Sequence, residues 1–133
     1  MESPPANMPA RVLEGARLLV VEDEIIILLE LEAVLLDAGA AVRLCGTVAQ
    51  ALYLVNHEEA FAAAVLDIRV GQSDIAPVAR ALERRGIPFV FYTGQTQFEP
   101  VRAQWPTCPI VTKPAPSWMI TGAVARLLRA GDA

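Results

Sequence analysis

The chain has 133 residues, of which 54% are hydrophobic and 20% are charged, and its formal net charge at pH 7 is -4. This length corresponds to one domain of roughly 100–200 residues, and so apolar a composition excludes an intrinsically disordered chain. No apolar run reaches the roughly 18 residues of a membrane-spanning helix, and no stripe of Lys and Arg marks a nucleic-acid surface. We therefore expect neither membrane insertion nor direct nucleic-acid binding.

Residues 1–15 contain three prolines before Arg11 and no apolar signal-peptide core. We expect a flexible N-terminal tail over 1–15, a folded domain over 16–131 and a cytoplasmic protein. Two cysteines, Cys45 and Cys108, lie in no recognisable spacing motif and are expected to be reduced and buried in or beside strands. The single histidine, His57, is expected on the surface of a helix.

Strand-like apolar segments alternate with helix-like segments along the chain, a pattern that predicts βαβ units and a parallel sheet. The expected strands cover 16–21, 41–45, 62–66, 88–92 and 109–112. The expected helices run over 24–37, from a cap at Thr47 to 58, from a cap at Ser73 or Asp74 to Gly86, and over 116–129. Between Gly94 and Pro106 the prolines break any apolar period, so a fourth helix is expected to be short or absent.

The helix expected over 24–37 has two apolar stripes at helical spacing. The first is expected to face the core and comprises Ile27, Leu31, Val34, Leu35 and Ala38. The second is expected outside the core and comprises Ile25, Leu28, Leu29 and Leu36. A second stripe can be covered by the tail or by a partner protein.

Polar residues follow four of the expected strands, at the point where each strand ends. Glu22 and Asp23 follow LLVV, Asp67 follows AAAVL, Thr93 follows FVFY and Lys113 follows PIVT. Because the carboxyl ends of parallel strands meet at one edge of a sheet, these groups are expected to share one pocket. Acids, a hydroxyl and an ammonium together suit divalent-metal and phosphoryl chemistry.

Each group has a chemical role in such a pocket. Asp23 and Asp67 can supply hard oxygen ligands to Mg²⁺, and the longer Glu22 can reach the metal through a water. A carboxylate beside bound Mg²⁺ can accept a phosphoryl group, and we assign that role to Asp67. Lys113 would pair with the carboxylate or the phosphoryl oxygens, and the Thr93 hydroxyl would donate to a phosphoryl oxygen.

The motifs V-E-D-E, V-L-D, Y-T-G and T-K-P, in this order over 16–130, resemble those of a response-regulator receiver domain. The resemblance implies a doubly wound, flavodoxin-like α/β fold: a five-stranded parallel sheet of order 2-1-3-4-5 flanked by five helices. It also implies Mg²⁺-dependent phosphoryl transfer from a histidine kinase to Asp67, followed by spontaneous hydrolysis. The implied metal ligands are Asp23, Asp67 and the main-chain carbonyl of Arg69, with Glu22 in the outer acidic position.

One feature departs from the pattern of many receivers, and a second resembles one of their subgroups. Many receivers have an aromatic switch residue three positions before the lysine, where this chain has Ile110. The sequence Phe91-Tyr92-Thr93-Gly94 is similar to the Phe-Ala-Thr-Gly ("FATGUY") subgroup, with Tyr92 where alanine is commoner. By that resemblance the partner kinase would belong to the HWE or HisKA2 groups.

Alternative functions remain open at this stage. A pseudo-receiver would keep the fold as an interaction module without phosphorylation. An aspartyl-phosphate hydrolase would need an acid two residues after the nucleophile, where Arg69 stands, so we do not expect an enzyme. No output segment follows the domain, so we expect a stand-alone receiver that signals to a downstream protein or buffers phosphate. The second stripe of the first helix would then bind the kinase or a second copy of the chain.

Overall fold

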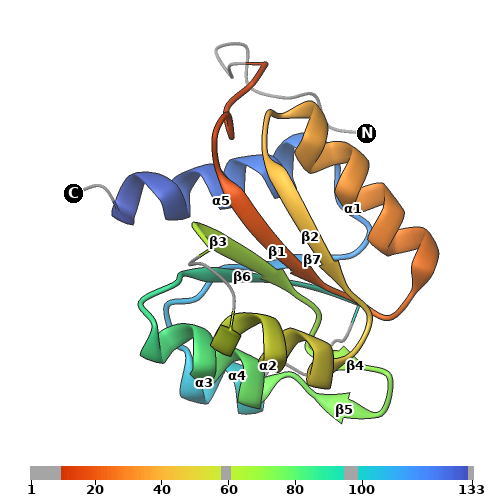
Figure 1. Cartoon of the computed structure of the whole chain (residues 1–133), viewed down its shortest axis with the longest axis vertical. Coiled ribbons are helices and arrows are strands. Elements are labelled where there is room, and N and C mark those ends of the chain that lie inside the picture. Colours follow the sequence, from red (N-terminus) through yellow and green to blue (C-terminus); the bar gives the residue numbers. More distant parts are fainter. Residues whose placement is uncertain (1–9, 58–60, 95–98, 132–133) are drawn as a thin grey trace.

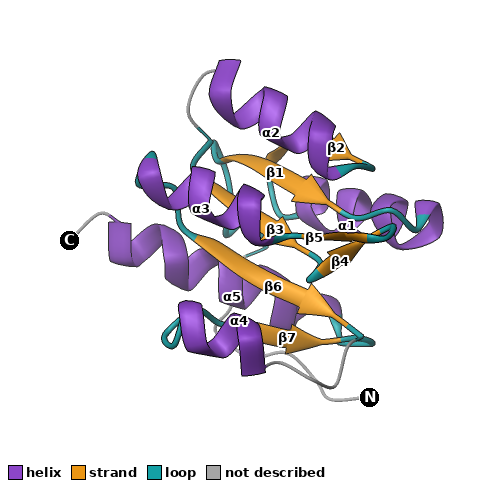
Figure 2. Cartoon of the chain, turned by 90° about the horizontal axis from the view of Figure 1, so that it is seen from below, coloured by secondary structure: helices purple, strands orange, loops and turns teal. Residues whose placement is uncertain are grey.

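The computed structural model describes residues 10–57, 61–94 and 99–131 and shows a five-stranded parallel sheet (Figures 1 and 2). Its strands, in spatial order, are β2 (Ala41–Cys45), β1 (Arg17–Val21), β3 (Ala63–Leu66), β6 (Phe89–Thr93) and β7 (Ile110–Thr112). This is the predicted order 2-1-3-4-5, because the two-residue strands β4 (Arg69–Val70) and β5 (Ser73–Asp74) form a separate antiparallel pair. The predicted doubly wound fold is therefore confirmed.

Helices cover both faces of this sheet, as Figure 1 shows. The helices are α1 (Ile25–Asp37), α2 (Val48–His57), α3 (Ala76–Arg84), α4 (Glu99–Gln104) and α5 (Ser117–Gly131). One apolar cluster joins α1 and α5 to one face, and a second joins α2, α3 and α4 to the other. Helix α4 has six residues, in agreement with the prediction of a short fourth helix.

The alternation of side chains along β6 shows how the sheet divides these two clusters. Phe89 and Phe91 pack on the α2–α4 side, where the Trp105 ring lies 5.9 Å from that of Phe89. Val90 and Tyr92 pack on the α1–α5 side. A central strand buried on both faces needs apolar residues at successive positions, which explains the near-continuous apolar run in the sequence.

The helix ends follow local signals in the sequence. The Thr47 hydroxyl accepts a hydrogen bond from the amide of Gln50 at 3.1 Å, and the Gln50 side chain accepts one from the amide of Gly46 at 3.3 Å. This reciprocal arrangement caps α2 as predicted. The Asp74 carboxylate accepts a hydrogen bond from the amide of Ala76 at 2.7 Å, so Asp74 caps α3. The end predicted for α2 at Glu58 lies outside the described residues.

The segment before β1 takes part in the core, although the sequence assigned it to a tail. Leu13 is 1% exposed, and its amide donates to the carbonyl of Ala38 at 2.8 Å. Gly39 has a φ of 101°, and a Cβ there would lie 2.8 Å from the Cα of Glu14. The packed structure therefore includes residues before Ala16, while residues 1–9 of the expected tail lie outside the described part.

Two details differ from the expectations. Leu28, predicted outside the core, is 8% exposed and packs in the α1–α5 cluster, whereas Ile26 is 70% exposed. The helix is rotated so that Leu28 faces the sheet and Ile27 lies at the edge of the packed face. The β4–β5 hairpin was not predicted, and it turns through Gly71, whose φ of 63° favours glycine.

Candidate functional site

The carboxyl ends of the parallel strands bring three acids together. Glu22 and Asp23 directly follow β1, and Asp67 directly follows β3, its hydrogen-bonded neighbour. One carboxylate oxygen from each of these residues lies within 4.8 Å of the others. Glu22 and Asp67 are buried and Asp23 is exposed, so the cluster has one side open to solvent. A cation can therefore reach the cluster from solvent.

Lys113 supplies the positive charge of this cluster. Its Nζ donates to Oε2 of Glu22 at 2.6 Å and to Oδ2 of Asp67 at 3.0 Å. Its backbone amide donates to the carbonyl of Thr93 at 2.9 Å, which ties the residue after β7 to the end of β6. Thr93 is fully buried at that strand end. The structure thus places Lys113 between the two buried acids.

Burial and charge shift the proton affinities of these groups. Glu22 is 1% exposed, and loss of hydration raises its pKa from 4.5 to about 7, although hydrogen bonds from Lys113 and from the Glu24 amide oppose the shift. Burial disfavours the charged form of Lys113, but its hydrogen bonds to Glu22 and Asp67 outweigh this, and the pKa of Lys113 is raised. The ammonium is therefore retained at neutral pH.

The donor set of the cluster fits a hard divalent cation. When ionised, the three carboxylates carry three negative charges against the single charge of Lys113, which leaves two negative charges among these four groups. Mg²⁺ in proteins is usually bound by one or two carboxylates, with water completing its octahedron, and this cluster offers that number with a further acid beside them. Glu22, Asp23 and Asp67 could therefore hold Mg²⁺.

Arg69 lies two residues after Asp67, at the start of β4. Its side chain is exposed, and Nη2 donates to the carbonyl of Gln72 across the hairpin at 3.3 Å. This hydrogen bond within the hairpin keeps the guanidinium beside the loop that follows Asp67. The role of the Arg69 main-chain carbonyl as a metal ligand stays a prediction.

The residues predicted to lie away from the site do so. His57 is exposed on α2, where its ring stacks on Tyr53 with centroids 4.4 Å apart. Cys45 is buried in β2 and Cys108 is partly buried before β7, and both are reduced. Burial raises the pKa of Cys108 to about 12, so this thiol is protonated at neutral pH.

The sequence did not predict that Tyr92 contacts Lys113. The ring centroid of Tyr92 lies 5.7 Å from Nζ of Lys113, within the range of a cation–π contact. Ile110, at the position of the aromatic switch, is partly buried and packs on the opposite face of the sheet. The motif Y-T-G was visible in the sequence, but the fold was needed to show what the tyrosine touches.

Comparison with solved structures identifies the family. A response regulator receiver protein from Sinorhizobium medicae WSM419 has 33% sequence identity, superposes with a TM-score of 0.80, and is matched over 89% of this chain and 98% of its own. The chain belongs to the response regulator receiver family. No protein-family model matches this receiver. No curated protein matches it either.

More distant structures share the receiver fold. A CheY-like receiver domain protein from Methanospirillum hungatei JF-1 has 21% identity and a TM-score of 0.78, with 88% of this chain and 96% of that chain covered. The response regulator PhyR from Brucella abortus has 23% identity and a TM-score of 0.76, with 92% of this chain and 52% of that chain covered. At this identity the likeness establishes the fold.

The receiver fold supports a signalling role of the response-regulator type rather than that of a classical enzyme. Within the described residues, no helix is long and apolar enough to cross a membrane.

Proposed function

We propose that this receiver accepts a phosphoryl group on Asp67 from a histidine kinase in a Mg²⁺-dependent reaction. The observation that carries the proposal is the position of Lys113, whose Nζ lies 2.6 Å from Glu22 and 3.0 Å from Asp67 within the acidic cluster. An ammonium held against the acceptor carboxylate can neutralise charge on the incoming group. Membership of the receiver family supports the same reading.

In the transfer, an Asp67 carboxylate oxygen forms the bond to phosphorus as the bond from phosphorus to the kinase imidazole nitrogen breaks. The bonding electron pair returns to the imidazole, which takes up a proton from water. Mg²⁺, held by Asp23, Asp67 and the Arg69 carbonyl with Glu22 in the outer position, would supply charge neutralisation and align the phosphoryl oxygens. Lys113 would pair with these oxygens, and the Thr93 hydroxyl would donate to one of them.

The face of α1 that points away from the core is the proposed kinase-binding surface. Ile25, Ile26, Leu29 and Leu36 are 64, 70, 51 and 49% exposed. The helix carries acidic residues and no Lys or Arg. By resemblance to the FATGUY subgroup, the partner would be a cytoplasmic domain of an HWE or HisKA2 kinase. Leu29→Lys is expected to leave phosphorylation by a small donor unchanged and to lower transfer from a cognate kinase.

The first test is the intact mass of the protein after incubation with Mg²⁺ and a small acyl-phosphate donor. We expect a phosphate-sized gain that disappears in Asp67→Asn and when EDTA removes the metal. Asp37→Asn, which neutralises an exposed carboxylate at the end of α1, is the matched control and should retain the gain. A gain that persists in Asp67→Asn would contradict the assignment of the acceptor.

The second candidate is a pseudo-receiver that binds partners without phosphorylation, favoured by the absence of an aromatic residue at Ile110. No mass gain with the small donor or with HWE and HisKA2 kinases would favour it.

A competent receiver would act through protein contacts, either on a downstream partner or as a phosphate buffer. Phosphotransfer in the reverse direction, from the receiver to the kinase histidine, would support the buffering role.

A further inference from the structure

We propose that Tyr92 is a positioning residue for Lys113: its ring limits where the side chain of the lysine can lie, so that the ammonium stays against Asp67. This inference rests on the proposed function for its effect on phosphorylation, but the contact itself can be tested without phosphate. Nothing in the common form of the motif supplies it, because the FATGUY pattern has alanine where this chain has Tyr92.

The ring of Tyr92 forms one side of the environment of the ammonium. Two carboxylates bind Nζ of Lys113, and the Tyr92 ring centroid lies 5.7 Å from the same atom. The Lys113 side chain is 12% exposed, so little water competes with the ring. A desolvated cation near an aromatic ring is attracted to it more strongly than an exposed one. The ring therefore limits where the ammonium can lie.

The backbone of Lys113 is tied to the same strand as Tyr92. Its amide donates to the carbonyl of Thr93 at 2.9 Å, and Thr93 directly follows Tyr92 in β6. The backbone and the ammonium of Lys113 are therefore both contacted by neighbouring residues of one strand.

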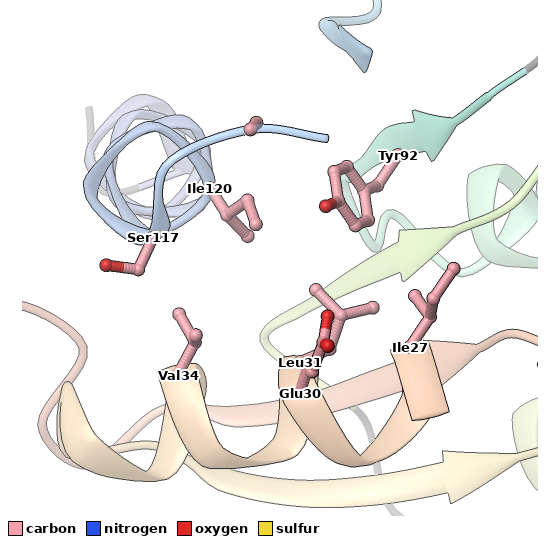
Figure 3. Close-up of a pocket in the computed structure, with 8 residues that line it drawn as sticks. Ile27, Glu30, Leu31, Val34, Tyr92, Ser117 and Ile120 are labelled. Atoms are coloured by element: carbon pink, nitrogen blue, oxygen red, sulfur yellow. The ribbon is translucent and has the colours of Figure 1, made fainter. Parts of the chain in front are cut away.

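Tyr92 is itself held firmly enough to serve as a support. It belongs to β6, where it pairs with Val111 of β7, and it is 8% exposed. Figure 3 shows its side chain projecting between α1 and α5, into a cavity of about 70 Å³ that Ile27, Leu31, Val34 and Ile120 also line. Burial raises the pKa of the Tyr92 hydroxyl, so the phenol is neutral at physiological pH and brings no charge near the ammonium.

Two substitutions separate the ring from the hydroxyl. Tyr92→Phe keeps the ring and removes only the hydroxyl, and Tyr92→Leu removes both. We expect the rate of phosphorylation by a small acyl-phosphate donor at saturating Mg²⁺ to stay within about twofold of wild type in Tyr92→Phe and to fall about tenfold in Tyr92→Leu. Tyr53→Leu, the same change on the exposed face of α2, is the matched control and should leave the rate unchanged.

The decisive measurement is the effect of Tyr92→Leu in a Lys113→Met background. If Tyr92 acts through the ammonium, its loss changes the residual rate in that background by less than about twofold. Equal losses in both backgrounds would show a general structural role and overturn the inference, as would an unchanged rate in the wild-type background. Circular dichroism and thermal melting check that each variant folds, and Tyr92→Met, which also lacks the ring, carries the test if Tyr92→Leu does not fold.

A direct readout keeps the inference separate from the proposed function. In NMR spectra of the unphosphorylated protein, we expect a changed shift of the Lys113 Cε resonance in Tyr92→Leu, because the ring current is lost, and little change in Tyr92→Phe, which keeps the ring. Failure of the wild-type protein to accept phosphate would overturn the proposed function alone. An unchanged Lys113 resonance in Tyr92→Leu would overturn the positioning role, whatever the phosphorylation result.

Discussion

Glu22 is expected to make the metal-free protein less stable as pH rises, and Glu22→Gln should remove this effect. The pKa of Glu22 is raised from 4.5 to about 7, chiefly by burial. Between these values the folded state binds more protons at this site than the unfolded state does. The free energy of unfolding therefore falls as pH increases through this range.

The magnitude follows from the two pKa values. Each tenfold change in a protonation equilibrium corresponds to about 1.4 kcal/mol, so a displacement from 4.5 to about 7 corresponds to at most about 3 kcal/mol. The pKa of about 7 for Glu22 already includes the effect of Lys113, because the ion pair between the two residues opposes the rise in that pKa. Its own pKa is raised, so its charge does not change between about pH 5 and about pH 8 and adds no slope there.

The assay is urea unfolding of wild type and Glu22→Gln in EDTA at about pH 5 and about pH 8. We expect the free energy of unfolding of the variant, relative to wild type, to increase by about 1–3 kcal/mol between these two conditions. Asp37→Asn, at an exposed position, is the control and should show no such change. A difference that stays constant with pH, or that decreases, would refute the argument that burial dominates at Glu22. Saturating Mg²⁺ should raise the stability of wild type more than that of the variant, because metal binding favours the folded, ionised form.

The packing observations give further predictions, all measured by urea unfolding at one pH. Leu13→Ala should cost about 2–4 kcal/mol because the side chain is 1% exposed, and a cost near zero would show that the segment before β1 is not part of the core. Gly39→Ala should cost more than about 1 kcal/mol, because its φ is 101° and its new Cβ would meet the Cα of Glu14. Gly46→Ala, with no atom within 4 Å of the new Cβ, is its control. Trp105→Ala should cost about 3–5 kcal/mol, since the ring is 6% exposed, and a cost below about 1 kcal/mol would contradict its place in the core.

The strand order and the shared edge were predictable because they depend on patterns that span whole segments. A run such as LLVV can be buried on both faces only in the middle of a layered fold, and the residue after it must then lie at the carboxyl edge. Glu22, Asp67 and Lys113 follow such runs, and the structure brings them within hydrogen-bonding distance through Lys113. The proximity of these three residues could therefore be predicted without knowing how the side chains pack.

Features that depend on one or two residues were not predictable in the same way. The strands of the β4–β5 hairpin are two residues long, too short for a period of two to be recognised, and Gly71 was its main signal. Leu13 has only Val12 as an apolar neighbour, too short a run to show a period, so its burial depended on how the segment before β1 meets Ala38. The position of Leu28 depended on the rotation of α1 about its axis, which an apolar run from Ile25 to Leu29 leaves undetermined.

Ile110 stands where many receivers have an aromatic switch residue. In this chain the aromatic residue that contacts Lys113 is Tyr92, on the opposite side of the sheet. Ile110 packs on the side of α2, α3 and α4, whereas Tyr92 packs on the side of α1 and α5. Phosphorylation of Asp67 would replace a carboxylate with a group of about -1.5 to -2 charge, and Lys113 must respond to it. Because Tyr92 contacts Lys113 and packs on the α1–α5 side, that response would pass first to this side. Helix α1, with its exposed apolar residues, lies on this same side. A protein bound to α1 would therefore bind the side of the receiver on which Tyr92 contacts Lys113.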